Sequence, residues 1–259
     1  MNDILQACLL GLVQGFTEFL PVSSSAHLIL LPKLMGWQDF GLPFDIAIHI
    51  GSLFAIVGYF FKDRVFKLNY RNLLLVIIAT IPVGLSGLLF KKIIAHNARS
   101  ITLISVTTIV FGILLGISYW WNKYKNKNFS IEHLSIKTAI LIGCAQAIAI
   151  IPGVSRSGIT LTAGLFLGFT STFAARFSFL LAIPVIFLAG GLQLLELIMD
   201  HSSINMQFIP ILISGFLSSM ISSLVFVWLF LKFIKQIGMW PFVIYRTLLG
   251  SLLWASSSW

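Results

Sequence analysis

Apolar residues occur along this chain in long runs that are separated by short polar segments. Six of these runs are close to about twenty residues, the length of an α-helix that crosses the hydrocarbon core of a membrane. They cover residues 42–61, 72–90, 100–121, 172–198, 209–231 and 239–258. The strict polar–apolar alternation of membrane β-barrel strands is not seen in the sequence. The pattern therefore predicts an all-α polytopic membrane protein with about six transmembrane helices.

Two further apolar regions, residues 4–31 and 138–168, are interrupted by polar residues and prolines. Pro21 and Pro32 divide the first region, and Pro152-Gly153 divides the second. Because proline ends or kinks a helix, each region is better described as two short helices than as one span. Irregular backbone at membrane depth is tolerated only inside protein or along a wet cavity. We therefore predict two re-entrant helical hairpins in addition to the six spans.

The two halves of the chain follow the same plan, a broken region and then three spans. When the sequence is shifted by 132 residues, four of twelve positions in the broken regions are identical. Gln14 then aligns with Gln146, Val22 with Val154, Ser23 with Ser155, and Ser25 with Ser157. This predicts a single membrane domain with inverted-topology repeats over roughly 1–121 and 138–259, joined by the loop 122–137. In such proteins the binding site lies where the repeats meet, near the membrane midplane.

The charges are few and mostly basic, with 17 Lys and Arg against 8 Asp and Glu, for a net charge of +9. Ten of the 17 lie in the three loops 62–71, 122–137 and 232–238. Lys and Arg gather in the cytoplasmic loops of membrane proteins, so these loops are predicted to be cytoplasmic and both termini to lie outside. The charge therefore indicates membrane orientation and not a nucleic-acid partner.

Residues 14–27, here called the first polar segment, concentrate polar groups in an apolar environment. A charged or polar group at membrane depth usually marks a functional site. Glu18 is a candidate metal ligand, an acid or base, or a group that orients another, and Gln14 lies on the same helical face. The three serines of this segment are candidate helix caps, and the more specific hypothesis is that one of them is a nucleophile. They are Ser23, Ser24 and Ser25. His27 is a candidate general acid, a nucleophile or a satisfied core histidine.

Residues 152–160, the second polar segment, have the sequence Pro-Gly-Val-Ser-Arg-Ser-Gly-Ile-Thr. A guanidinium such as that of Arg156 costs about 2.5–3.5 kcal/mol at the centre of a transmembrane helix, and it binds phosphate or carboxylate with two parallel hydrogen bonds. Its function is either to bind an anion or to form a charge pair with Glu18. The remaining candidates for phosphate binding are the flanking glycines and hydroxyl residues, together with main-chain N–H groups at a helix start. These are Gly153, Ser155, Ser157, Gly158 and Thr160.

Three isolated polar residues carry weaker signals. His49 is a lone histidine in a predicted span, and we interpret it as structural. Asp45, near the outer end of that span, is a candidate for a residue that supports the site residues without contacting the substrate. Arg246 is a second candidate positive charge near the site.

The two polar segments resemble the signatures of the bacterial undecaprenyl-diphosphatase family, the bacitracin-resistance phosphatases. Residues 174–184 and Tyr245-Arg246 resemble that family as well, so the resemblance covers most of the chain. It implies that Glu18, Ser24, His27 and Arg156 are catalytic, and that Ser155, Ser157 and Thr160 belong to the phosphate-binding signature. Ser23 and Ser25 are further candidates for phosphate binding. The family's first signature is Glu/Gln-x-x-x-Glu. This chain has Gln14 in the first position, which leaves Glu18 as the stronger metal-ligand candidate.

The resemblance also implies the reaction and its setting. A family member is an enzyme of the bacterial inner membrane, and its pocket opens outward. Its activity requires a divalent cation, Mg or Ca. It hydrolyses undecaprenyl diphosphate to undecaprenyl phosphate and inorganic phosphate, which returns the lipid carrier to cell-wall synthesis.

Several alternatives stay open at the level of the sequence. Attack by Ser24, by His27 or by water all fit the residues; we favour Ser24, with His27 accepting its proton and Glu18 orienting the imidazole or a cation. A flippase or transporter for prenyl phosphates is the alternative function, because inverted repeats with broken helices are typical of transporters. The oligomeric state is open, with a homo-oligomer among the options.

Overall fold

The computed structural model describes residues 2–62, 70–97, 100–199 and 206–257, which form ten α-helices and three short 3₁₀ helices. The α-helices are α1 (Asp3–Phe19), α2 (Ser24–Met35), α3 (Leu42–Lys62), α4 (Tyr70–Asn97), α5 (Ile101–Lys125), α6 (Ile136–Ala147), α7 (Arg156–Phe166), α8 (Ser171–Met199), α9 (Ile209–Ile237) and α10 (Trp240–Ser257). The 3₁₀ helices are η1 (Ile131–His133), η2 (Ile148–Ile150) and η3 (Met206–Phe208). This confirms the all-α prediction. Of the predicted basic loops, Arg64 and Lys67 lie outside the described residues, as does Arg99.

Five helices in the described residues are long and apolar enough to cross a membrane, namely α3, α4, α5, α8 and α9. They correspond to five of the six predicted spans. The sixth prediction corresponds to α10, which is not among the five: its 18 residues include Arg246 and begin with Trp240 and Pro241. Large apolar side chains are exposed along these helices, such as Leu89 on α4 and Phe187 on α8. The protein is therefore a multi-pass membrane protein whose outer surface suits lipid.

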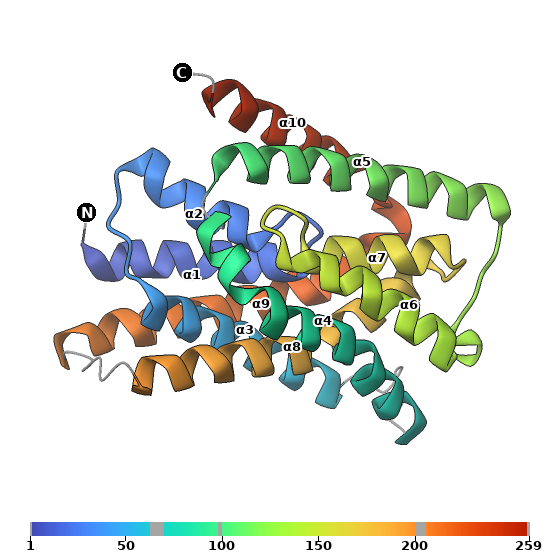
Figure 1. Ribbon diagram of the computed structural model, residues 1–259, viewed down its shortest axis with the longest axis horizontal. Helices are drawn as coiled ribbons and strands as arrows, with labels where there is room; N and C mark the ends of the chain where they lie inside the picture. The colour runs from blue at the N-terminus through green and yellow to red at the C-terminus, as the bar shows by residue number, and fades with distance from the viewer. Residues whose placement is uncertain (1, 63–69, 98–99, 200–205, 258–259) are drawn as a thin grey trace.

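The two interrupted regions each form a pair of short helices, as predicted. The first pair is α1 and α2, and the second is α6, extended by η2, and α7. Figure 1 shows the pairs entering from opposite ends of the molecule, with their turns near its centre. One detail differs from the prediction: Pro32 lies inside α2. That helix ends at Gly36, which is left-handed and donates its N–H to the Pro32 carbonyl.

The start of α1 and the end of α10 lie toward the left of Figure 1, and the segment after α5 lies at the right. The main helix pairs are α1 with α9, α3 with α9, α4 with α6, and α5 with α10, and α8 packs against both α3 and α4. The packing of α1 and α3 on α9 thus has a counterpart in the packing of α6 and α8 on α4.

Small residues allow the closest of these contacts. Gly15 on α1 and Gly51 on α3 lie directly against the main chain of α9, where a β-carbon would collide with the Ser219 or Phe216 carbonyl oxygen. Hydroxyl groups bridge the same interface, because Ser52 Oγ lies 2.9 Å from Ser219 Oγ and 3.0 Å from Ser223 Oγ. Small residues with interhelical hydrogen bonds are the usual means of helix association in membranes, where lipid competes for apolar contact.

Candidate active site

The turns of the two hairpins meet at the centre of the protein, and each contains a serine with unusual backbone geometry. Ser23 has φ of 72° and Ser155 has φ of 69°, a region that non-glycine residues rarely adopt. Each precedes the first residue of a helix, α2 or α7. In each turn two hydroxyls lie 3.2 Å apart, Ser23 with Ser25 and Ser155 with Ser157. The shifted alignment pairs these same residues.

The two turns differ in helix capping. Ser155 Oγ accepts a hydrogen bond from the Gly158 N–H at 3.1 Å, so it caps α7. Ser23, in the described structure, makes no such bond to the start of α2. The expectation that the serines of the first turn are helix caps is therefore not met at Ser23. The hydroxyls of that turn face the pocket described below.

Arg246 on α10 links the two turns through hydrogen bonds to their main chain. It is fully buried, and in the described structure its hydrogen-bond acceptors are all main-chain carbonyl oxygens. Its guanidinium donates to Gly153 at 2.8 Å, Val154 at 3.0 Å, Thr108 at 3.2 Å and Pro21 at 3.4 Å. It thus contacts both turns and α5. The sequence had suggested a charge near the site, and the structure gives it this bridging position.

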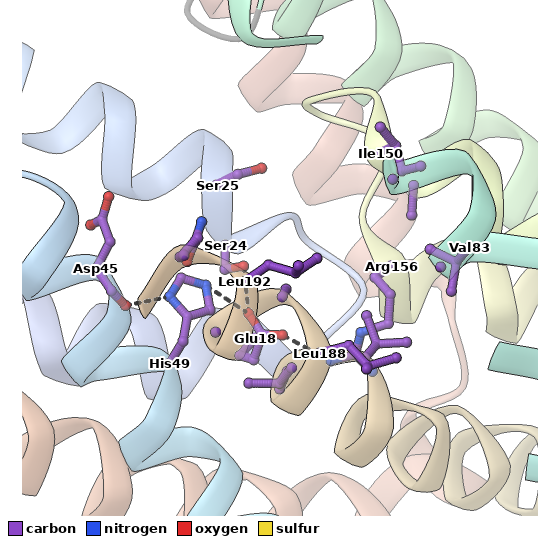
Figure 2. A pocket seen from close by; sticks show the side chains of 18 of the residues that line it. Glu18, Ser24, Ser25, Asp45, His49, Val83, Ile150, Arg156, Leu188 and Leu192 are labelled. Carbon is purple, nitrogen blue, oxygen red and sulfur yellow. Dashed lines mark hydrogen bonds and ion pairs between the residues drawn. The ribbon is translucent and has the colours of Figure 1, made fainter. Parts of the chain in front are cut away.

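Glu18, at the end of α1, is the centre of the polar cluster (Figure 2). Arg156 Nη2 donates to Glu18 Oε1 at 2.8 Å, an ion pair that joins the two halves of the chain. Ser24 Oγ donates to Glu18 Oε2 at 2.7 Å, and Gln14 Nε2 donates to the same oxygen at 3.1 Å. Arg156 Nη1 also donates to the Ser178 carbonyl at 3.1 Å. The two polar segments thus meet through directly bonded side chains.

A cavity of about 390 Å³ opens beside this cluster. Its polar lining consists of Glu18, Ser23, Ser24, Ser25, Asp45, His49, Thr80, Ser155, Arg156 and Gln193. Its apolar lining comes mainly from α4 and α8, including Val83, Gly84, Leu188 and Leu192. A β-carbon on Gly84 or Gly87 would meet no atom within 4 Å, so these glycines leave one wall open. The cavity therefore suits a molecule with an anionic head and a hydrocarbon tail.

Not all of the predicted phosphate-binding residues reach this cavity. Ser23, Ser25 and Ser155 line it, whereas Gly153, Ser157, Gly158 and Thr160 are buried outside its lining. Ser157 Oγ donates to the Leu20 carbonyl at 2.8 Å, and Thr160 Oγ1 donates to the Arg156 carbonyl at 2.9 Å. Gly153 has φ of +87°, and a β-carbon there would collide with Thr107 Oγ1. In the structure these four residues shape the second turn.

His27 lies outside the cavity lining and away from the carboxylate. Its Nδ1 is 2.7 Å from the Ser23 carbonyl, and its Nε2 is 2.5 Å from Tyr245 Oη. A carbonyl only accepts, so Nδ1 carries the proton and Nε2 accepts from the tyrosine. The expectation that His27 takes the proton of Ser24 does not match this arrangement, because the Ser24 hydroxyl donates to Glu18. His27 instead links the first turn to α10, as a satisfied core histidine would.

His49 is the site residue that the sequence interpretation missed. It lines the cavity from α3, with Nε2 3.8 Å from Glu18 Oε2. The carboxylate of Asp45, which also lines the cavity, points away from Glu18 in Figure 2. Nothing in the local sequence distinguishes His49 from a structural histidine. Its placement depends on how α3 packs against α1.

The described residues do not fit a metal centre formed by the protein alone. They contain no group of three His, Cys, Asp or Glu side chains placed to hold a metal ion. Glu18 Oε1 already contacts a guanidinium, and Gln14 contributes only one unpartnered amide oxygen, Oε1. These are fewer oxygens than Mg²⁺ or Ca²⁺ requires, so no step below depends on a metal.

Comparison with known proteins agrees with the geometry. The family model described as bacitracin resistance protein BacA matches residues 7–252. A protein of Campylobacter concisus named undecaprenyl-diphosphatase is 49% identical, with 97% of this chain and 98% of that protein covered. Proteins with the same name from Saccharophagus degradans and Marinobacter nauticus are 48% and 44% identical, each with 98% of both chains covered. This chain therefore belongs to the bacitracin resistance protein BacA family.

Proposed function

We propose that this protein is an enzyme that hydrolyses undecaprenyl diphosphate to undecaprenyl phosphate and inorganic phosphate. One observation carries the proposal: a single cavity joins the Glu18–Arg156–Ser24 cluster to an apolar wall from α4 and α8. A prenyl diphosphate has the matching two parts, a charged head and a long hydrocarbon tail. The relatives named above are named for this activity, and they align with this chain over nearly their whole length.

Binding of the diphosphate requires positive charge and hydrogen-bond donors. A guanidinium has five N–H donors, and Arg156 uses Nη2 on Glu18 and Nη1 on the Ser178 carbonyl, so donors remain for phosphate oxygens. The hydroxyls of Ser23, Ser25 and Ser155 face the same cavity. The first turns of α2 and α7 begin beside it, and the positive ends of their helix dipoles favour an anion there.

The reaction begins at Ser24. As Ser24 Oγ attacks the terminal phosphorus, its proton passes to Glu18 Oε2, to which it is already hydrogen-bonded at 2.7 Å. The bond between that phosphorus and the bridging oxygen breaks, and undecaprenyl phosphate leaves. Arg156 stabilises the charge on the phosphoryl oxygens, which is the main task of a phosphoryl-transfer site. Water then hydrolyses the serine phosphate ester.

The identity of the nucleophile predicts a covalent intermediate. Rapid quenching of enzyme with terminally labelled substrate should leave label on the protein that survives acid, as a serine phosphate does, and Ser24→Ala should abolish it. Acid-labile, base-stable label that persists in Ser24→Ala would instead assign the attack to a histidine, His49 or His27, and peptide mapping of the label would tell them apart. If no label forms under any quench, water attacks the substrate directly.

The activity itself is tested without a membrane. Purified protein in detergent should release inorganic phosphate from solubilised prenyl diphosphate. A flippase that only moves prenyl phosphates would release none, and the family relationship does not favour that alternative. A requirement for Mg²⁺ or Ca²⁺ stays a prediction; such an ion would need oxygens of the diphosphate in addition to Glu18.

We also propose that the protein lies in the bacterial inner membrane with its two halves related by duplication and its pocket open to the outside. The paired helix contacts and the two positive-φ serines support the duplication. The oligomeric state, with a homo-oligomer among the options, is left open.

The orientation has a direct test. In a variant whose native Cys8 and Cys144 are replaced by serine, a cysteine added after Trp259 should react with a membrane-impermeant reagent on intact cells. A cysteine at Asn126, in the loop after α5, should react only after the membrane is opened. This follows from the concentration of Lys and Arg in the loop 122–137. The opposite labelling pattern would invert the whole topology.

A further inference from the structure

His49 presents an imidazole nitrogen to the pocket in a defined state. Its Nδ1 lies 2.7 Å from the Asp45 carbonyl, one helical turn earlier on α3. Because a carbonyl can only accept, Nδ1 carries the proton, and in the neutral ring Nε2 has a free lone pair. That nitrogen lies 3.8 Å from Glu18 Oε2, the oxygen to which Ser24 donates. Figure 2 shows His49 and Ser24 side by side around this carboxylate.

His27 is the other histidine close to the serine turn, and it differs from His49 in what its Nε2 contacts. It makes the same local bond, from Nδ1 to the carbonyl four residues earlier, but its Nε2 is occupied by Tyr245 Oη at 2.5 Å. The described residues that line the cavity include His49 and do not include His27. The position of the imidazole in space, and not its spacing from the serines, therefore decides which histidine can contact a phosphoryl group.

The charged groups around His49 are few. Glu18 faces it from α1, Arg156 lies across the carboxylate on α7, and Asp45 is on its own helix. From α8, Gln193 lines the same cavity, and from α9 the polar groups that contact α3 are the hydroxyls of Ser219 and Ser223. These are the charged and polar groups that face the His49 imidazole in the described structure.

We propose that His49 is a catalytic residue, the general base for hydrolysis of the phosphoserine. This rests on the function and the Ser24 nucleophile proposed above. In that step the oxygen of water bonds to phosphorus, and one proton of the water passes to His49 Nε2. The bond between phosphorus and Ser24 Oγ breaks, and Oγ regains the proton that Glu18 received in the first step. Inorganic phosphate leaves, and His49 returns its proton to the solvent.

The proposal separates the two halves of the reaction. With His49→Gln, label should appear on Ser24 and one equivalent of prenyl phosphate should form at close to the normal rate. Phosphate release should then slow by a factor on the order of 10² to 10⁴, the usual contribution of a general base. The labelled enzyme should accumulate. Added imidazole should restore part of the phosphate release in His49→Ala.

The matched control is His27→Gln, which removes a histidine with the same local bond but leaves the proposed base in place. This variant should not accumulate labelled enzyme. Thermal unfolding in detergent should be equal for wild type and His49→Gln.

If His49→Gln slows labelling and phosphate release equally, or leaves both unchanged, His49 is not the base. If wild type turns over without ever carrying label, this proposal fails while the proposed function stands; if wild type releases no phosphate, the function fails first.

Discussion

Replacing Arg246 by methionine should cost several kcal/mol of unfolding free energy and abolish phosphate release. Methionine fills much of the same volume but removes the guanidinium that donates to the carbonyls of Pro21, Thr108, Gly153 and Val154. The Gly153 carbonyl keeps a long bond of 3.4 Å from Thr108 Oγ1, and the Thr108 carbonyl lies within helix α5, so the loss falls mainly on Pro21 and Val154. Each buried acceptor left unpaired costs about 1–3 kcal/mol. The two turns also lose the side chain that holds them together. Thermal unfolding in detergent and phosphate release measure the two effects.

Arg71 provides the matched control for this variant. It too donates to a main-chain carbonyl, Leu134 at 2.6 Å, but among the described residues this is its one side-chain hydrogen bond, and the residue is exposed. Arg71→Met should therefore lower stability far less and should leave turnover close to wild type. If Arg246→Met unfolds at the same temperature as Arg71→Met, then the carbonyl bonds contribute little and the role assigned to Arg246 is wrong.

Arg156→Lys should lower diphosphate hydrolysis by well over tenfold while the protein still folds. The guanidinium bonds Glu18 and the Ser178 carbonyl at once, through different nitrogens, and has donors left for phosphate. A lysine ammonium is a point charge and cannot hold all of these in one geometry. One or two lost charge-assisted hydrogen bonds, at about 1.5–3 kcal/mol each, account for the expected loss.

Two measurements keep this prediction separate from a loss of structure. The thermal unfolding temperature of Arg156→Lys should stay within a few degrees of wild type, because the positive charge beside Glu18 is kept. Arg71→Lys, a substitution of the same kind away from the cavity, should retain normal turnover. Near-normal hydrolysis by Arg156→Lys would reduce this residue to an ion-pair partner of Glu18, the alternative that the sequence left open.

Much of the architecture follows from the sequence, because the strongest signals are local. Runs of apolar residues define the spans, and Pro21 and Pro152 mark the breaks of the hairpins. A carboxylate and a guanidinium in apolar surroundings each require a partner, and Glu18 and Arg156 are the partners of each other. The weaker prediction was at α10, where a buried arginine dilutes the apolar pattern of a span.

The roles of the two histidines could not be read from the sequence. Each bonds the carbonyl four residues earlier, so their local environments are the same. What separates them is the residue that meets Nε2, Tyr245 from α10 for His27 and Glu18 from α1 for His49. These contacts depend on how distant helices pack. For the same reason the sequence could not distinguish the hydroxyls that face the cavity from those, such as Ser157, that bond a carbonyl.

The ion pair between Glu18 and Arg156 has a consequence for the biosynthesis of the chain. The two residues are 138 positions apart, so a ribosome that adds about 5–20 residues per second makes Arg156 roughly 7 to 28 s after Glu18. During that interval the first hairpin has a carboxyl group but no counter-ion, and burial of a charge in hydrocarbon is unfavourable by about 2.5–3.5 kcal/mol. We therefore expect the first hairpin to stay protonated or close to the membrane surface until the second is inserted. On this expectation both hairpins reach their final depth together, late in membrane integration.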